Sequence, residues 1–286
     1  AEGKTGLLRS LGLREATALN MIDMVGIGPF VTMAMVINIM NGPQCIIAWV
    51  LGAALSLLDG MVWSELGTRW PEAGGSVVFL RHLYGERTWG KLLSFLFIWQ
   101  TVFQAPLVIA SGAIGFSEHV AYLLPLSPLA AKAVSGGLVA LLTVVLYRRI
   151  ESAGRISIGL WCVLIVTIGW ILVSGVMHFD AHRAFDVAPG GWSITPLFFV
   201  ALGQAMGKTV YSYLGYYNVC HLGAEIEHPQ KNIPRSMFLS IAGIAVLYLG
   251  MQLSILGALP WQEARHSSFV FSTFFERLYG PTTAIY

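Results

Sequence analysis

Two short stretches combine glycine with neighbours that could leave backbone groups free to bind a ligand. VGIGPF at 25–30 places two glycines and a proline in an apolar run, although glycine costs about 1 kcal/mol and proline about 3 kcal/mol against alanine in a helix. YSYLGYYN at 211–218 puts Gly215 among aromatic and polar residues. Both stretches predict interrupted helices, which expose N–H and C=O groups. The helix that restarts at Gly28–Pro29 would present free amides and a positive dipole end, which suits a carboxylate.

Ionisable side chains inside apolar segments are costly and therefore mark candidate functional positions. Asp23 lies just before the first break, so we expect it to bind a proton, a cation or a basic partner, as a coupling group or a structural one. Lys208, about one turn before the second break, is expected to meet an acidic group of the missing helices, to bind an acidic substrate or to extend into the outer vestibule. Asp59 is expected to form a structural pair with another side chain or to contact water. Gln100 and Gln104 either line a pocket or bond between helices.

The pattern formed by His221, Glu225 and His228 resembles a zinc cluster only loosely. Their order differs from the His-Glu-x-x-His of metalloproteases, and His228 precedes a proline, which disfavours a helical conformation there. We therefore expect no metal, no cofactor and no enzyme activity, with an intramembrane metalloprotease as a weak alternative.

The composition describes a membrane protein. Of the 286 residues, 56% are hydrophobic and 11% are charged, against roughly 25% charged in soluble domains. The lipid bilayer is thus the expected surrounding, and a net charge of +2 gives no reason to expect nucleic acid. Spans of about 20 apolar residues cross a bilayer. Seven such stretches are expected, at 16–40, 44–64, 92–117, 128–147, 156–178, 195–222 and 236–259.

The distribution of basic residues predicts the orientation. Most of the 17 Lys and Arg residues fall in connections on the side of the N-terminus, which makes that side cytoplasmic in a cell-membrane protein. Residues 1–14 are then a cytoplasmic segment, and 76–85 is expected to form a helix along the cytoplasmic interface. We expect residues 1–286 to be one transmembrane domain that is incomplete at its C-terminal end. The oligomeric state is not indicated.

The two breaks fall in the first and sixth expected spans. A single G-x-G could equally be a kink or a packing contact, because glycine is common in membrane helices. Two breaks five spans apart instead fit an inverted five-helix repeat, which places a binding site near the membrane midplane.

Three stretches resemble the amino acid–polyamine–organocation (APC) superfamily of transporters, which share the LeuT-type fold. They are GIGPF at 26–30, SELGTRWPEAGGSVVFLRHLYG at 64–85 and YSYLGYYNVCHLGAEIEHPQKNIPRSM at 211–237. The resemblance covers essentially the whole chain. It implies an all-α, multi-pass, inverted-repeat fold with helices 1 and 6 broken, of which this chain would hold helices 1–7 and an outer loop.

The resemblance also implies roles for the residues of the two breaks. The amides of Ile27 and Gly28 would hold a substrate carboxylate, and the carbonyls of Met24, Tyr211 and Leu214 would receive an α-ammonium group. The expected substrate-binding set is Met24, Gly26, Ile27, Gly28, Tyr211, Ser212, Leu214, Gly215 and Tyr216.

Gating and coupling roles follow from the same resemblance. Tyr211 would cover the substrate, and Glu65 and Glu225 would close the cytoplasmic side with basic residues, although surface ion pairs explain the two glutamates equally well. Ile165 stands where many relatives carry a lysine that replaces a sodium ion, so Asp23 becomes the candidate for coupling to H⁺ or Na⁺. Ile27 also replaces a small, often hydroxylated residue of the helix 1 break.

The function expected from these features is secondary active transport of amino acids by alternating access, with cation coupling or exchange. A polyamine or organic-cation transporter of the same superfamily is the alternative substrate assignment. A channel-like membrane protein is the alternative from another class.

Overall fold

The computed structural model describes residues 9–26, 28–124, 126–147, 150–187, 191–267 and 269–280. These residues form helices and no strand, with two isolated β-bridges. The long helices are α1 (Leu13–Met24), α2 (Gly28–Met40), α3 (Cys45–Arg69), α5 (Gly90–Leu123), α6 (Pro128–Tyr147), α7 (Ile150–Met177), α9 (Pro196–Tyr213) and α10 (Pro229–Ala258). The shorter elements are α4 (Ser76–Tyr84), the π-turn η1 (Gly85–Trp89), α8 (Ala181–Ala184), the 3₁₀ segment η2 (Tyr216–His221), α11 (Trp261–Ala264) and α12 (Val270–Tyr279).

Fewer helices than the seven expected spans are long and apolar enough to cross a membrane. Within the described ranges there are four such helices, or five if the bent pair α1 and α2 counts as one span. The expected span at 156–178 corresponds to α7, whose apolar part is the shorter stretch Trp161–Met177. The expected span at 195–222 ends early, because α9 stops at Tyr213. The chain is nevertheless an all-α, multi-pass membrane protein, and the first and sixth of the expected spans are interrupted, after Met24 and after Tyr213.

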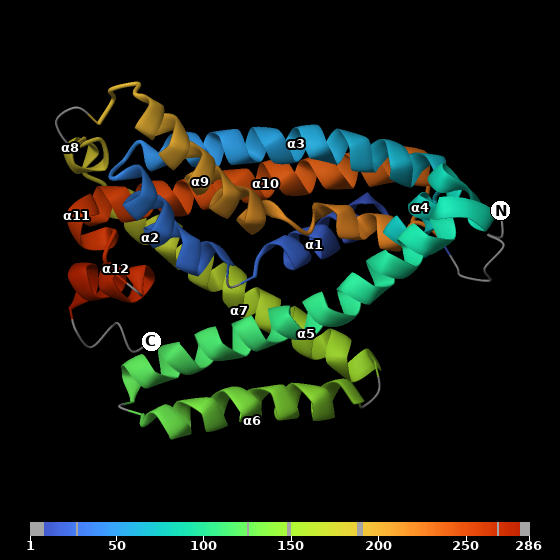
Figure 1. The fold of residues 1–286 in the computed structure, drawn as a ribbon. Coiled ribbons are helices and arrows are strands. Elements are labelled where there is room, and N and C mark those ends of the chain that lie inside the picture. The colour runs from blue at the N-terminus through green and yellow to red at the C-terminus, as the bar shows by residue number, and fades with distance from the viewer. Residues whose placement is uncertain are drawn as a thin grey trace.

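A bundle of α1, α2, α3, α9 and α10 forms the core (Figure 1). Trp49 of α3, Tyr213 of α9 and Tyr248 of α10 are fully buried, and their ring centroids lie 5.4–5.9 Å apart. The Trp49 indole also donates a hydrogen bond to the Gln252 side chain over 2.9 Å. Aromatic clusters of this kind gain from area burial and from ring geometry, so this one fixes three helices around the breaks.

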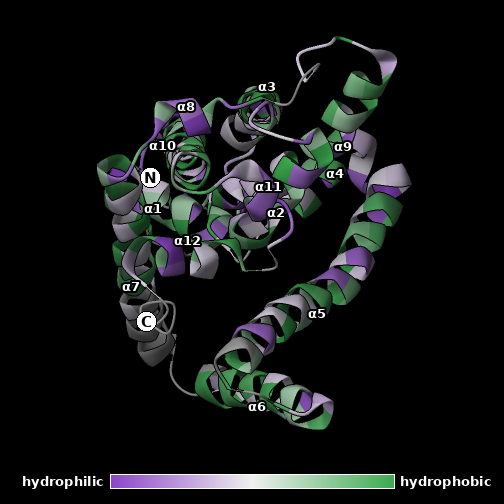
Figure 2. Ribbon diagram, turned by 90° about the vertical axis from the view of Figure 1, so that its left-hand side faces the viewer, coloured by the Kyte–Doolittle hydropathy of each residue, from purple (hydrophilic) through white to green (hydrophobic). Residues whose placement is uncertain are grey.

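Two helices stand away from this bundle. In Figures 1 and 2, α5 runs obliquely from α4, and α6 folds back along α5 on its far side. In the most apolar stretch of α4–α5, 6% of the residues are buried, and in that of α6 none are. In the corresponding stretch of α10, 50% of the residues are buried. Figure 2 shows these helices to be largely hydrophobic. Two clefts open between α5 and the bundle, and both border the breaks.

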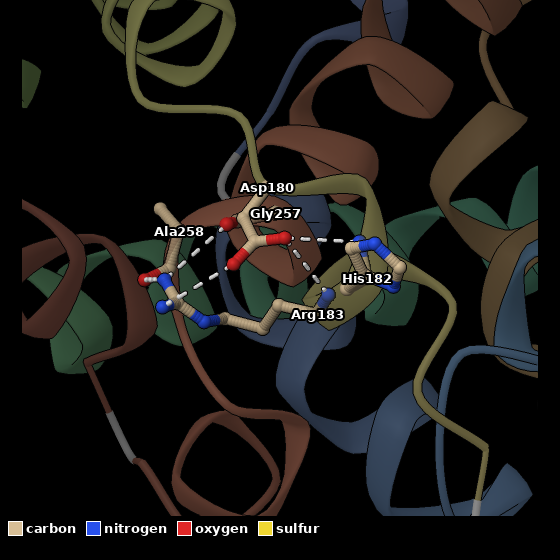
Figure 3. Close-up of polar contacts among 5 residues, drawn as sticks. All are labelled: Asp180, His182, Arg183, Gly257 and Ala258. Carbon is tan, nitrogen blue, oxygen red and sulfur yellow. Dashed lines mark hydrogen bonds and ion pairs between the residues drawn. The ribbon is translucent and has the colours of Figure 1, made fainter.

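A polar brace joins α8 and its N-cap to the end of α10 (Figure 3). The Asp180 carboxylate accepts hydrogen bonds from the backbone N–H groups of His182 and Arg183, at 2.9 and 3.3 Å, and so caps α8. The Arg183 guanidinium lies 3.7 Å from Asp180 and donates to the carbonyl of Ala258 over 2.9 Å. A cation at the last carbonyls of a helix is favoured by their partial negative charge, so the brace fixes the C-terminal end of α10.

The segment after η2 lies between two other parts of the chain. The N–H groups of Ser10 and Leu11 both donate to the Glu225 carbonyl at 3.0 Å, and Leu11 pairs in parallel with Ile226. On the other side, Ala73 pairs with Leu222. The expected helix at 76–85 is present as α4, while its position on the cytoplasmic surface stays a prediction.

Candidate substrate site

The first break separates two helices that share one expected span. α1 ends at Met24, Val25 leaves the helical conformation, and α2 begins at Gly28, with a bend of 55° between the axes. Pro29 occupies the first turn of α2, where its missing N–H costs nothing. Ile27 lies outside the described residues. Apart from its chain neighbours, no described residue has an atom within 4 Å of where a Cβ of Gly26 would be, so this side of the break is open.

The second break follows α9. This helix has an N-cap, because the Thr195 hydroxyl accepts a hydrogen bond from the Phe198 N–H. Pro196 follows as its first residue. It ends at Tyr213, after which Leu214 is extended and Gly215 has φ +123°. Glycine adopts this conformation without the penalty of a side chain. The chain then continues as η2, not as a second long half-helix.

The two breaks lie against each other. A Cβ on Gly215 would come within 3.0 Å of the carbonyl carbon and oxygen of Asp23, so the backbones touch where only glycine fits. A Cβ on Gly28 would meet Tyr211 Cε1 and Ser212 Oγ at 3.8 Å, which is ordinary contact. Two backbone segments about 190 residues apart therefore meet at one place, between the start of α2 and the end of α9.

Two clefts follow one another along α5 and border this meeting place. The first, of about 680 Å³, is lined by Gly28, Tyr211, Lys208 and Glu118 among others. The second, of about 800 Å³, is lined by α5 residues 97–109 together with part of η2 and Leu214. The break thus connects with open space on both sides.

Some residues of the expected binding set face these clefts and others are buried. Tyr211 is 56% exposed, and Leu214 is 37% exposed. Met24, Ser212 and Tyr216 are buried.

The buried members support the walls through their own hydrogen bonds. The Met24 carbonyl accepts from the Tyr248 hydroxyl over 3.0 Å. Ser212 Oγ shares a 2.9 Å hydrogen bond with Thr32, which joins α9 to α2. The Tyr216 hydroxyl donates to Asp59 over 2.6 Å.

Asp23 faces the second broken span. Its carboxylate lies beside the Asn218 side chain and near the His221 ring, both of η2. Asn218 and His221 also line the second cleft. An acidic group of the first break therefore meets polar and titratable groups of the second, an arrangement suited to holding a proton or a cation.

Within the part of the chain that the structure describes, neither of the two glutamates expected to act as gates forms an ion pair. Among the described residues the ion pairs are His82–Glu72 and Arg183–Asp180, and neither includes Glu65 or Glu225. Glu225 is instead held through its backbone carbonyl by the N-terminal segment. Gating by these side chains stays a prediction.

The remaining polar candidates lie along the clefts. Asp59, Gln100 and Gln104 line the second cleft, where the Gln100 amide donates to Gln104 one turn away on the same helix. Asp59 makes the structural hydrogen bond with Tyr216 that was one of its two expected uses. Lys208 lines the first cleft and takes part in no ion pair with the described residues.

Over the part of the chain that the structure describes, no group of three His, Cys, Asp or Glu side chains could hold a metal ion. His221 ends η2, and His228 stands before α10 with φ +45°, outside any helix. These two histidines and Glu225 do not form a metal site.

Two residues near the breaks carry no obvious sequence signal. Tyr248 lies in the apolar run of α10, and only its position opposite Met24 gives it a role. Asn20 is 1% exposed within α1 and hydrogen-bonds to the backbone of η2. A buried asparagine in a membrane helix needs partners, and that rule alone could have drawn attention to it.

Comparison with known proteins assigns the family. The family model described as amino acid permease matches residues 11–286. The chain is 26% identical over 294 residues to the Asc-type amino acid transporter 1 of Mus musculus, covering 98% of this chain and 53% of that protein. It is 26% identical over 259 residues to the serine/threonine exchanger SteT of Bacillus subtilis (strain 168), covering 90% and 57%.

A third relative is the putrescine transporter PotE of Escherichia coli (strain K12), 24% identical over 277 residues, with 95% of this chain and 60% of that protein covered. The chain thus spans little more than half the length of these curated relatives. With a family model matched over nearly its whole length, the chain belongs to the amino acid permease family of the APC superfamily.

Proposed function

We propose that this chain carries the substrate site of a secondary active transporter that moves amino acids by alternating access. The observation that carries the proposal is the contact between the two breaks, where Gly215 lies against the backbone of Asp23 and Gly28 lies beside Tyr211. Unwound backbone at membrane depth is tolerated where it lines a cavity or binds a ligand. Half-helix ends at a repeat interface are the usual site of small charged substrates.

An amino acid would bind between the two breaks through its carboxylate and its ammonium group. We assign its carboxylate to the amides at the start of α2, around Gly28, where the helix dipole favours an anion. We assign its ammonium group to the carbonyls of Tyr211 and Leu214. The Met24 carbonyl is a weaker candidate than the resemblance implied, because it already accepts from the Tyr248 hydroxyl and from the Gly26 N–H. Tyr211, exposed on the first cleft, would cover the bound substrate.

The clefts suggest the route. Tyr211 borders the first cleft and Leu214 the second, so a substrate held between them would lie where the two meet. With the N-terminus in the cytoplasm of the cell, as the basic residues predict, the second cleft is the inner one. Glu65 and Glu225 would then act on the inner side.

Coupling to H⁺ or Na⁺ through Asp23, or exchange of one substrate for another, completes the proposal. The name of one relative describes an exchanger, which supports the second possibility. The name of another describes a putrescine transporter, so a polyamine or organic cation is the second candidate substrate class.

Uptake into proteoliposomes tests the proposal. We expect saturable, stereoselective uptake of a labelled amino acid, and a panel of unlabelled amino acids and amines should compete according to substrate class. Competition by diamines alone would favour the organic-cation assignment. Uptake that rises linearly with concentration and ignores stereochemistry would indicate a channel and contradict the proposal.

A further inference from the structure

The Asn20 side chain bridges three elements at the inner side of the breaks. It lies on α1, one turn before Met24, and is 1% exposed. Its amide nitrogen donates to the Tyr216 carbonyl over 2.8 Å and to the Ser240 hydroxyl over 3.4 Å. Its amide oxygen accepts from the Val219 N–H over 3.1 Å. Both the donor and the acceptor of this one amide are therefore used.

The match between this amide and η2 is specific. Tyr216 and Val219 are three residues apart, so their C=O and N–H groups lie at the two ends of one 3₁₀ turn. A side-chain amide carries a donor and an acceptor together, and Asn20 presents one to each group. A short 3₁₀ segment has poorer internal hydrogen bonds than an α-helix. Its placement therefore depends strongly on such outside contacts.

The contact also sets the position of the second break. Gly215 directly precedes η2 and lies against the backbone of Asp23, three residues after Asn20. The unwound chain is thus fixed to α1 at two adjacent points, the Asn20 amide and the Gly215 backbone. Helices α2 and α9 have a separate link, between Thr32 and Ser212.

We propose that Asn20 is a positioning residue, which holds the unwound part of the sixth span on the inner half of the first span and keeps the two breaks in register. Substrate binding at the breaks, which is the proposed function, then depends on Asn20 although its buried side chain touches no substrate.

Asn20→Leu tests this inference, because leucine is similar in size and removes both hydrogen-bonding groups. In the reconstituted protein we expect amide hydrogen exchange over residues 216–221 to rise roughly tenfold or more, and KM for uptake to rise by a similar factor. The control is Thr17→Val, one turn earlier on α1, because among the described residues the Thr17 hydroxyl bonds only within its own helix, to the Leu13 carbonyl. It should leave both exchange and KM unchanged.

Unchanged exchange and unchanged KM in folded Asn20→Leu would overturn the inference, as would equal effects from Thr17→Val. A fall in the amount of folded protein with parental KM would show a merely structural role and also overturn it. If the leucine variant does not fold, Asn20→Ala replaces it. Alanine also removes both hydrogen-bonding groups, so the same changes should appear. If the parent protein itself fails to take up amino acids, the proposed function fails, whereas the exchange measurement still decides the role of Asn20.

Discussion

The Tyr248 hydroxyl donates a hydrogen bond to the Met24 backbone carbonyl over 3.0 Å. Met24 is the last residue of α1, and both residues are buried. The Tyr248 ring also packs against Trp49 and Tyr213, with ring centroids 5.5 and 5.4 Å away. The C-terminal end of α1 is therefore hydrogen-bonded to the aromatic cluster of Trp49, Tyr213 and Tyr248.

Tyr248→Phe should destabilise the protein, because it leaves the buried Met24 carbonyl without this donor. The carbonyl keeps the Gly26 N–H as its other donor at 3.2 Å, so the cost is that of one lost hydrogen bond, about 0.5–1.5 kcal/mol, to be measured as the change in unfolding free energy of the purified protein. Tyr279→Phe is the control, because the Tyr279 hydroxyl contacts Ser174 in a part-buried position at the periphery and should cost less. A larger loss from the control would contradict the role given to Tyr248.

Gly215→Ala should disturb the contact between the two breaks. Its φ of +123° and the 3.0 Å approach to Asp23 both disfavour a side chain, and a strained backbone position costs roughly 1–3 kcal/mol. We expect reduced thermal stability and a strong loss of uptake. Gly203→Ala, on α9, serves as the control and should be tolerated, because no described atom outside the neighbouring turns of α9 lies within 4 Å of the new Cβ. Equal behaviour of the two variants would remove the special role of Gly215.

Gly28→Leu should abolish uptake without preventing membrane insertion. The longer side chain would extend past Tyr211 and Ser212, which lie 3.8 Å from the Cβ position, into the space assigned to the substrate carboxylate. Gly28→Ala makes only ordinary contacts there and should retain more activity. The measurement is uptake normalised to the amount of protein in the membrane. Near-normal transport by the leucine variant would move the carboxylate site elsewhere.

Asp23→Asn should make uptake independent of pH and sodium while substrate binding stays largely intact, because the amide keeps the size of the carboxylate and loses its charge. Asp59→Asn is the comparison, since Asp59 is bonded to the Tyr216 hydroxyl at the second cleft and should leave the ion dependence in place. The measurement is uptake across pH and sodium series with binding determined in parallel. If Asp23→Asn keeps the full ion dependence, Asp23 is structural.

The amino-acid sequence by itself determined the class of the molecule and the positions of both interruptions. Few charges and long apolar runs identify a membrane protein however its helices pack, because a segment crosses the bilayer when it is long and apolar enough. Gly28, Pro29 and Gly215 fixed where helices stop or restart, since glycine and proline act on the local backbone. These signals did not predict that the chain after Gly215 forms the short 3₁₀ segment η2 in place of a second half-helix.

The tertiary structure alone decided which groups meet at the breaks. Tyr248 and Met24 are 224 residues apart, and Asn20 and Tyr216 are 196 apart, so no local pattern relates them. The same holds for the occupied Met24 carbonyl and for the absence of ion pairs at Glu65 and Glu225 among the described residues. A hydrogen bond forms only when two groups come within about 3 Å in a suitable direction. Composition and periodicity place residues on helices, whereas only the packing of those helices brings particular groups to that distance.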